Sequence, residues 1–325
     1  MNIYFIINPQ AKNGYCKKVW RKLESILLEK EISYMAFFTE YRGHAKEIVQ
    51  SLAVKTEGKK IMMIAVGGDG TIHEVINGAA PFPNVIVSFI PGGSGNDFSR
   101  GFRISKKPTQ ALTALLQQLD QEQITFVDTG IIMNKQEENL FFINNMGAGF
   151  DALISKQVNQ SKIKRILNRL ALGKFVYVYF LLINLFTYKK SLINVRIDGA
   201  DYDFRSAWFV TVSNQPFYGG GMKISPEASP VDGKLNITVV HNLSRVKLLL
   251  VFMTVFWGGH TRFKEVSLLT GRSIQINSNS PLHVHADGED IGKTPVQINI
   301  SHRNLPVIIN GHVNEGEETN SNEAK

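Results

Sequence analysis

The 325-residue sequence holds one cysteine, Cys16, so it cannot form an intramolecular disulfide and is typical of a protein from a reducing compartment. It also lacks a run of about 18 consecutive apolar residues, the length that a membrane-spanning helix needs. The longest apolar runs are "FVYVYFLLINLF" (175–186) and "LLLVFMTVFW" (248–257). Each could be a buried helix or a segment that contacts a membrane surface. The N-terminal "MNIYFIINP" lacks the basic start and the apolar length of a signal peptide, and we interpret it as a first strand.

Acidic residues are missing from residues 152–197, which contain nine lysines and arginines. This segment carries as much positive excess as the whole chain, whose net charge is +8. Because the basic residues flank the run 175–186 on both sides, the pattern favours an anionic membrane surface as partner, with a solvated basic face on a core helix as the alternative. The aromatics of this segment fall within the apolar run, which argues against nucleic acid. We therefore expect a cytoplasmic protein that associates peripherally with the membrane.

Strand-like and helix-like segments alternate in the first part of the chain. Short apolar runs occur at 2–7, 33–39, 61–66 and 84–90, with helical segments at about 15–30, 43–54 and 71–79 between them. This alternation predicts an α/β domain with a parallel sheet. One more helix after Pro108 and a strand at "ITFVDTG" complete this domain, to which we assign residues 1–128.

The pattern changes after that strand. Short alternating runs such as "INVRID", "AWFVTVSN" and "KLNITVV" are separated by turn residues, which predicts an antiparallel β domain over residues 129–302. A helix at 245–258 and the basic helix interrupt it. We expect 303–314 to return to the first domain as a strand, and 315–325 to be a disordered polar tail.

Three polar loops follow predicted parallel strands: "NPQAKNG" (8–14), "GGDGT" (67–71) and "PGGSGND" (91–97). Loops after the carboxyl ends of parallel strands share one edge of the sheet, where ligands bind. Glycines allow successive backbone amides to converge on an anion, and the N-terminus of a following helix strengthens the attraction. The three loops together predict a phosphate-binding site.

Spacing excludes the common motifs that these loops imitate. "GGDGTIH" has His73 where the dinucleotide fingerprint needs its third glycine, and "GGSGN" has Asn96 at the last position of the serine-hydrolase elbow. "GEDIGKT" (288–294) has three residues between its glycines, one fewer than a P-loop requires.

"GGDGTIHEVINGA", "PGGSGNDFSR" and the "NP-x-A" of the first loop resemble the diacylglycerol kinase catalytic-domain family, in its bacterial branch of soluble lipid kinases. "GAGFDA" (147–152), "YGGGMKISPEASPVDGKL" (218–235) and "HADGE" (285–289) follow in the family's order, so the resemblance covers essentially the whole chain. It implies an ATP-dependent lipid kinase with ATP between an α/β domain and a β-sandwich, diacylglycerol as the expected acceptor, and a possible homodimer. An NAD kinase, which shares GGDGT, and a non-catalytic nucleotide-binding regulator are the alternatives.

The resemblance also implies which residues contact ATP. They are Asn8, Pro9, Gln10, Ala11, Lys12, Thr39, Gly67, Gly68, Asp69, Gly70, Thr71, Ile72, His73, Ser94 and Asp97. Carboxylates at Asp69 and Asp97 beside a polyphosphate are tolerable if Mg²⁺ lies between them, whereas a helix N-cap is the alternative for Asp97. The family often has Asn at position 73, so His73 is a departure that could alter nucleotide fit or add pH sensitivity. Ser94 replaces the family's usual Thr and keeps its hydroxyl.

"HVHADGE" (283–289) contains the predicted chemical groups. If it is a strand, alternate residues share one face, and His-x-His with Asp would be a weak metal candidate. The resemblance makes Asp287 and Glu289 the catalytic pair, without settling which takes the proton from the acceptor hydroxyl, whereas a plain hairpin turn is the alternative. "SPVDGKL" (229–235) matches the family's structural Mg²⁺ loop. That match implies Ser229, Asp232 and Lys234 as ligands, with Ser229 and Lys234 acting largely through backbone oxygen and water.

Overall fold

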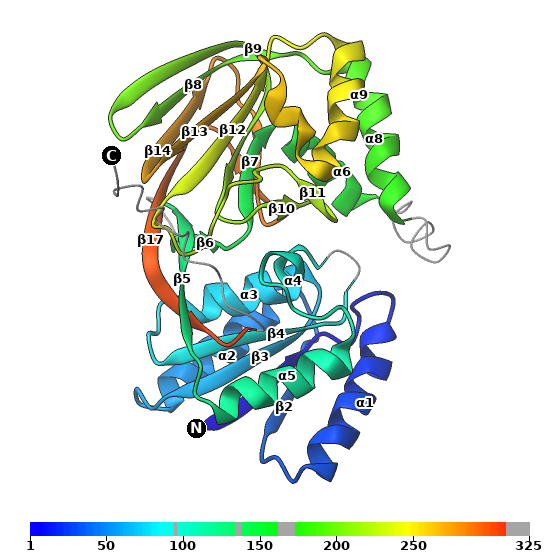
Figure 1. Cartoon of the computed structure of the whole chain (residues 1–325), viewed down its shortest axis with the longest axis vertical. Helices are drawn as coiled ribbons and strands as arrows, with labels where there is room; N and C mark the ends of the chain where they lie inside the picture. Colours follow the sequence, from blue (N-terminus) through cyan, green and yellow to red (C-terminus); the bar gives the residue numbers. More distant parts are fainter. Residues whose placement is uncertain (94–95, 134–137, 162–172, 310–325) are drawn as a thin grey trace, which may run out of the picture.

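The structure is a computed structural model that describes residues 1–93, 96–133, 138–161 and 173–309, without the side chains of 173–178. It has two lobes stacked end to end, with two strands running between them (Figure 1). We call residues 2–120 the N-terminal lobe and residues 140–293 the C-terminal lobe. Ser94, the predicted tail 315–325 and the basic residues between 162 and 172 lie outside the described residues.

The N-terminal lobe is an α/β structure on four parallel strands in the order β2-β1-β3-β4. Its elements are β1 (Asn2–Ile7), α1 (Tyr15–Glu29), β2 (Met35–Phe38), α2 (His44–Lys55), β3 (Ile61–Gly67), α3 (Asp69–Ala79), β4 (Val85–Pro91), α4 (Asp97–Gly101) and α5 (Pro108–Asp120). Every residue of β3 and β4 is buried, which explains their unbroken apolar runs. The predicted α/β fold is confirmed.

Helix α3 begins earlier than the sequence pattern predicts. The carbonyl oxygen of Gly68 accepts hydrogen bonds from Thr71 N at 2.9 Å and Ile72 N at 3.2 Å, so helical hydrogen bonding starts inside GGDGT. The helix therefore begins at Asp69 instead of Thr71. This difference places the Asp69 carboxylate in the first helical turn, at the carboxyl end of β3.

The C-terminal lobe is built on an antiparallel sheet, as predicted. Its elements are β6 (Leu140–Phe142), β7 (Asn145–Gly149), α6 (Phe150–Gln160), α8 (Gly173–Thr187), β8 (Ser191–Ile197), β9 (Ala200–Ser213), β10 (Phe217–Tyr218), β11 (Met222–Lys223), β12 (Leu235–His241), α9 (Arg245–Thr254), η1 (Val255–Trp257), η2 (Gly259–Arg262), β13 (Val266–Gly271), β14 (Ser273–Ser278), β15 (His283–Ala286) and β16 (Glu289–Lys293). Helices α6, α8 and α9 lie on one side of this lobe and share an apolar cluster around the buried Trp208 of β9 (Figure 1).

Two strands join the lobes. β5 (Thr125–Ile132) leaves the N-terminal lobe and β17 (Val296–Val307) returns to it, and the two pair antiparallel along most of their length. At its end β17 pairs parallel to β4, with Val307 opposite Val87. The sheets of the two lobes are thereby continuous, and the register of β5 and β17 shifts between Ser301 and Leu305.

Candidate active site between the lobes

The three glycine-rich and polar loops meet at one edge of the parallel sheet. Asn8 Nδ2 donates to Thr71 Oγ1 at 3.2 Å, which joins the first loop to the second. The second and third loops touch through backbone, because Gly92 N donates to Gly67 O at 2.6 Å. A Cβ on Gly93 would lie 2.4 Å from the Cα of Gly68, so this approach requires glycine.

The predicted ATP contacts differ in their accessibility. Gln10 and Lys12 are exposed at the first loop, and the backbone of Thr39 follows β2 in the same edge, donating to Ile7 O at 2.9 Å. Ile72 points into the core of the N-terminal lobe and is fully buried. The ring of His73 is turned toward the C-terminal lobe, as described below.

Two carboxylates mark the beginnings of α3 and α4. Desolvation raises the pKa of Asp69 to about 7, and the charge of Asp97, followed by that of Asp287, adds to the rise. Burial also raises the pKa of Asp97, although hydrogen bonds from Gly220 N at 2.7 Å and Arg100 at 2.5 Å oppose it. Asn96 occupies the N-cap position of α4, so Asp97 is not the cap. Crowded carboxylates beside phosphate-binding loops are a donor set that fits Mg²⁺.

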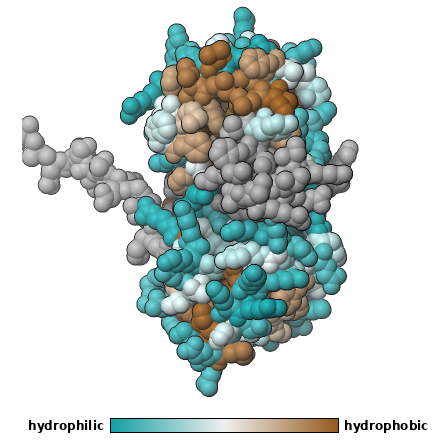
Figure 2. Space-filling model, turned by 90° about the vertical axis from the view of Figure 1, so that its right-hand side faces the viewer, coloured by the Kyte–Doolittle hydropathy of each residue, from teal (hydrophilic) through white to brown (hydrophobic). Residues whose placement is uncertain are grey.

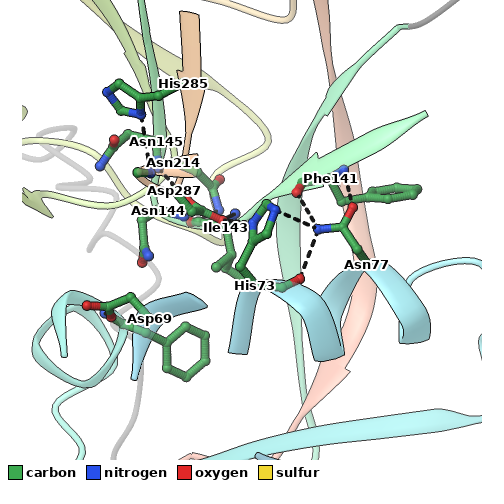
Figure 3. Close-up of polar contacts among 12 residues, drawn as sticks. Asp69, His73, Asn77, Phe141, Ile143, Asn144, Asn145, Asn214, His285 and Asp287 are labelled. Atoms are coloured by element: carbon green, nitrogen blue, oxygen red, sulfur yellow. Dashed lines mark hydrogen bonds and ion pairs between the residues drawn. The ribbon is translucent and has the colours of Figure 1, made fainter. Parts of the chain in front are cut away.

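Asp287 lies in the turn between β15 and β16, with a left-handed φ of 48°. Its Oδ1 accepts from Asn144 N at 2.9 Å and Asn145 N at 3.1 Å, and its Oδ2 from Ile143 N at 3.1 Å (Figure 3). His73 Nδ1, from α3 of the other lobe, lies 3.0 Å from Oδ2. The side chain is 1% exposed, so four donors fix this carboxylate at the boundary between the lobes.

Glu289, two residues on, is held differently. Its side chain is 30% exposed and pairs with Arg42, itself largely exposed, which follows β2 in the N-terminal lobe. A Cβ on Gly70 would lie 3.3 Å from Glu289 Oε1, so this carboxylate borders the second loop. The two predicted catalytic carboxylates therefore contact different residues of the N-terminal lobe. Asp287 meets His73 of α3, and Glu289 borders Gly70 of the second loop.

Helix α6 holds the turn that carries both carboxylates. Ser155 Oγ and Asn159 Nδ2 donate to the carbonyl oxygen of Gly288 at 3.0 and 2.7 Å. His285 Nδ1 accepts from Gly288 N at 3.3 Å, and its Nε2 lies 3.4 Å from Asp151 Oδ2 at the beginning of α6. His285 thus links the turn to the beginning of α6. Among the described residues no group of three or more His, Cys, Asp or Glu side chains is placed to hold a metal.

The predicted Mg²⁺ loop, 229–235, packs on Asp128 of β5. Asp128 N donates to Pro230 O, and Gly233 N donates to Asp128 Oδ2, both at 2.7 Å. Asp128 Oδ1 accepts from His302 Nδ1 and Arg303 N, also at 2.7 Å. Within the loop, Lys234 N donates to Asp232 Oδ1 at 2.9 Å. Protein donors thus surround the buried Asp128, and Asp232 is the one exposed carboxylate that the loop offers. Ser229, Asp232 and Lys234 as Mg²⁺ ligands stay a prediction.

Comparison with known proteins decides the family. The family described as "Diacylglycerol kinase catalytic domain" matches residues 2–130, and that described as "YegS C-terminal NAD kinase beta sandwich-like domain" matches residues 144–309. A Bacillus subtilis protein named "Putative lipid kinase YtlR" is 32% identical to this chain over 91% of it and 95% of its own length. The chain belongs to the diacylglycerol kinase family of lipid kinases.

Other relatives agree with this assignment. A Mycobacterium tuberculosis protein named "Diacylglycerol kinase" is 27% identical, with 82% of each chain covered. A crystal structure from Bacillus anthracis, titled as that of "a putative diacylglycerol kinase", superposes with a TM-score of 0.75 at 26% identity over 96% of each chain. The resemblance of the sequence motifs is thus confirmed, and the chain is a transferase of the kinase class. None of the described helices combines the length and apolar character needed to cross a membrane.

Sequence reasoning missed several residues around the site. Asp128 follows the apolar Phe126 and Val127 in β5 and is fully buried, and a buried acidic residue is a signal that it has a fixed partner. Arg42 gives no comparable signal, because its partner Glu289 is 247 residues away along the chain. Asn77 is likewise invisible in sequence, yet its side chain exchanges hydrogen bonds with the backbone of Phe141 and ties α3 to the C-terminal lobe.

Proposed function

We propose that this lipid kinase transfers the γ-phosphoryl group of ATP to the free hydroxyl of diacylglycerol, giving phosphatidic acid. The observation that carries the proposal is the position of Asp287. A buried carboxylate with a fixed orientation faces, across the lobe boundary, the helix start that carries Asp69 and the glycine-rich loops. Phosphoryl transfer needs this combination of phosphate-binding backbone and a positioned proton acceptor.

The N-terminal lobe supplies the phosphate side of the reaction. The backbone amides of the first and second loops and the dipole of α3 attract the triphosphate, and Lys12 adds an exposed positive charge. Asp69 and Asp97 would hold Mg²⁺, which when bound neutralises charge on the phosphates. Glu289 borders the second loop and pairs with Arg42, and we assign both to the nucleotide side of the site.

The C-terminal lobe supplies the acceptor side. We assign proton acceptance to Asp287 because its carboxylate is fixed in one orientation by backbone amides, whereas Glu289 is partly exposed and pairs with Arg42. Three backbone donors keep the Asp287 carboxylate oriented while it takes the proton from the hydroxyl of the acceptor. His73, hydrogen-bonded to the same carboxylate, positions it from the N-terminal lobe.

The test is transfer of labelled γ-phosphate from Mg-ATP to a panel of acceptors in mixed micelles: diacylglycerol, phosphatidylglycerol and NAD. We expect label in diacylglycerol, reduced roughly 10³-fold in Asp287→Asn, with Glu289→Gln raising the KM for ATP more than it lowers kcat. Circular dichroism and melting temperature would establish that both variants fold. Label in another lipid alone would contradict the acceptor, and label in NAD alone would overturn lipid phosphorylation altogether.

A further inference from the structure

An apolar surface lies on the side of the C-terminal lobe where α8, α9 and η1 run together (Figure 2). On α8 and α9 its members recur at intervals of three and four residues, so each helix exposes one apolar face. The opposite faces, which include Leu185 and Val251, pack into the shared core cluster. We call this surface the apolar platform, and its members are Tyr179, Leu182, Ile183, Phe186, Val246, Leu250, Met253, Phe256 and Trp257.

The platform is distinguished by the number of exposed apolar side chains that lie together on neighbouring helices. Val246, Phe186 and Trp257 are each 67% exposed, and Leu250 is 66% exposed. Helices of globular proteins usually present polar residues on the face opposite the core, whereas α8 and α9 are apolar on both faces. A contiguous patch of this kind marks a surface that is covered when the protein acts.

The charge around the platform indicates what covers it. The segments that carry it, residues 152–197 and 233–264, contain no acidic residue. Of their described basic residues, Lys156, Arg196 and Lys247 pair with Asp290, Asp201 and Glu265 of neighbouring segments. Lys189, Lys190 and Arg245 are exposed at the end of α8 and the beginning of α9, and Arg245 Nε donates to Leu185 O at 3.1 Å, joining the two helices. Apolar and aromatic residues with basic neighbours match the acyl boundary and headgroups of an anionic bilayer.

The apolar platform is also connected, through α6, to the turn that carries Asp287 and Glu289. Gln157 of α6 and Asn184 of α8 exchange side-chain hydrogen bonds at 2.6 and 3.2 Å. The same α6 donates from Ser155 and Asn159 to Gly288, between Asp287 and Glu289. Helix α8 therefore meets the membrane with its exposed face and contacts α6 through its buried face, and α6 in turn holds the turn that carries Asp287.

We propose that the apolar platform docks the enzyme on an anionic lipid bilayer and so presents the active site to acceptors in that bilayer. The proposal rests on the proposed lipid acceptor, and it adds the surface through which the membrane is met. A symmetric second copy is the less favourable occupant, because it would bring the two sets of basic residues together. A neutral or basic peptide helix would leave these basic residues without a counter-charge.

The experiment is co-sedimentation of the full chain with vesicles of phosphatidylcholine, with and without phosphatidylglycerol. The variant Val246→Gln/Leu250→Gln changes two exposed residues of the platform. Val54→Gln/Leu28→Gln is the matched control, since these residues of α2 and α1 are 66% and 67% exposed on the other lobe. We expect roughly tenfold weaker binding to anionic vesicles for the platform variant, wild-type binding for the control, and weaker wild-type binding at high salt.

Wild-type vesicle binding by the platform variant would overturn the proposal, as would equal losses in both variants. A change of the dimer equilibrium in the platform variant with unaltered vesicle binding would overturn it in favour of a second copy. The acceptor proposal fails separately. If the protein phosphorylates diacylglycerol in micelles but does not bind vesicles, the docking proposal alone is contradicted. If vesicle binding depends on the platform but no lipid is phosphorylated, docking is supported and the proposed acceptor is contradicted.

Discussion

The two sides of the active site are held in place by different means. On the N-terminal side, two loops touch through backbone: Gly92 donates to Gly67, and Gly93 lies against Gly68. On the C-terminal side, Asp287 is held by donors that lie between 142 and 214 residues away along the chain, three of them backbone amides and one the imidazole of His73. The contact between the glycine loops depends on the absence of side chains. The position of Asp287 depends on contacts between elements that are far apart in the sequence.

This difference predicts different responses to mutation. Gly93 tolerates no added atom at the point of contact, because a methyl group there would have to displace the backbone of Gly68. The Asp287 carboxylate has four donors, so removal of one leaves three to keep its orientation. We therefore expect steep losses from small changes on the N-terminal side and graded losses on the C-terminal side.

Among changes to residues that support the site without taking part in the chemistry, the largest effect is expected for Gly93→Ala. The new Cβ would lie 2.4 Å from Gly68 Cα, which forces the second and third loops apart, and such overpacking costs about 1–3 kcal/mol. Activity should fall at least about a hundredfold through loss of ATP binding, measured by titration calorimetry and steady-state kinetics. Gly68→Ala is the matched control, because its Cβ would meet Gly93 Cα at an ordinary 3.4 Å. Equal losses in the two variants would show that phosphate approach, rather than contact between the loops, requires the glycines.

Sequence reasoning predicted the N-terminal side well for the same physical reason. Each loop follows its own strand, so local patterns placed Asn8, Gly67 and Pro91 at one edge, and the parallel sheet brought them together. What the pattern could not show is that Gly93 is needed for contact with Gly68. That requirement depends on the distance between neighbouring strands, which no single segment contains.

A second prediction concerns the pH dependence of stability. It uses Asp69→Asn, which removes the charge of Asp69 and keeps the size of its side chain. Its pKa rises from 3.8 to about 7 on folding, so between these values the folded protein binds a proton that the unfolded chain has lost. The stability that this proton contributes is complete below pH 3.8 and is lost as the pH rises through about 7.

The melting temperature of the wild type, compared with that of Asp69→Asn, should therefore fall as the pH rises from about 5 to about 8. Addition of Mg²⁺ should restore more stability at the higher pH in the wild type and little in the variant, because the ion needs the charged carboxylate. Scanning fluorimetry across this range checks both statements. A difference that stays constant with pH would contradict the raised pKa, because Asp69 would then not titrate in this range.

The C-terminal side was predicted only in part. The "HADGE" motif identified the turn, and the structure shows that Asp287 and Glu289, although two residues apart, have different surroundings. Their neighbours come from α3, from the segment before β7 and from Arg42, so the sequence around the motif contains no information about them. For the same reason the proximity of His73 to Asp287 could not be derived from GGDGTIH, a motif whose resemblance implies a contact between His73 and the nucleotide.

The smallest effect is expected for His73→Asn, which tests the contact between the lobes. Asn is too short to reach Asp287 Oδ2 from the same backbone position, but the amides of Ile143, Asn144 and Asn145 still hold the carboxylate. We expect kcat to fall roughly tenfold, since one of four positioning contacts is lost, and the KM for ATP to stay within about twofold. Steady-state kinetics at varied ATP concentrations measures kcat and the KM for ATP separately. A raised KM with unchanged kcat would place His73 on the nucleotide side of the site and make Asp287 independent of the N-terminal lobe.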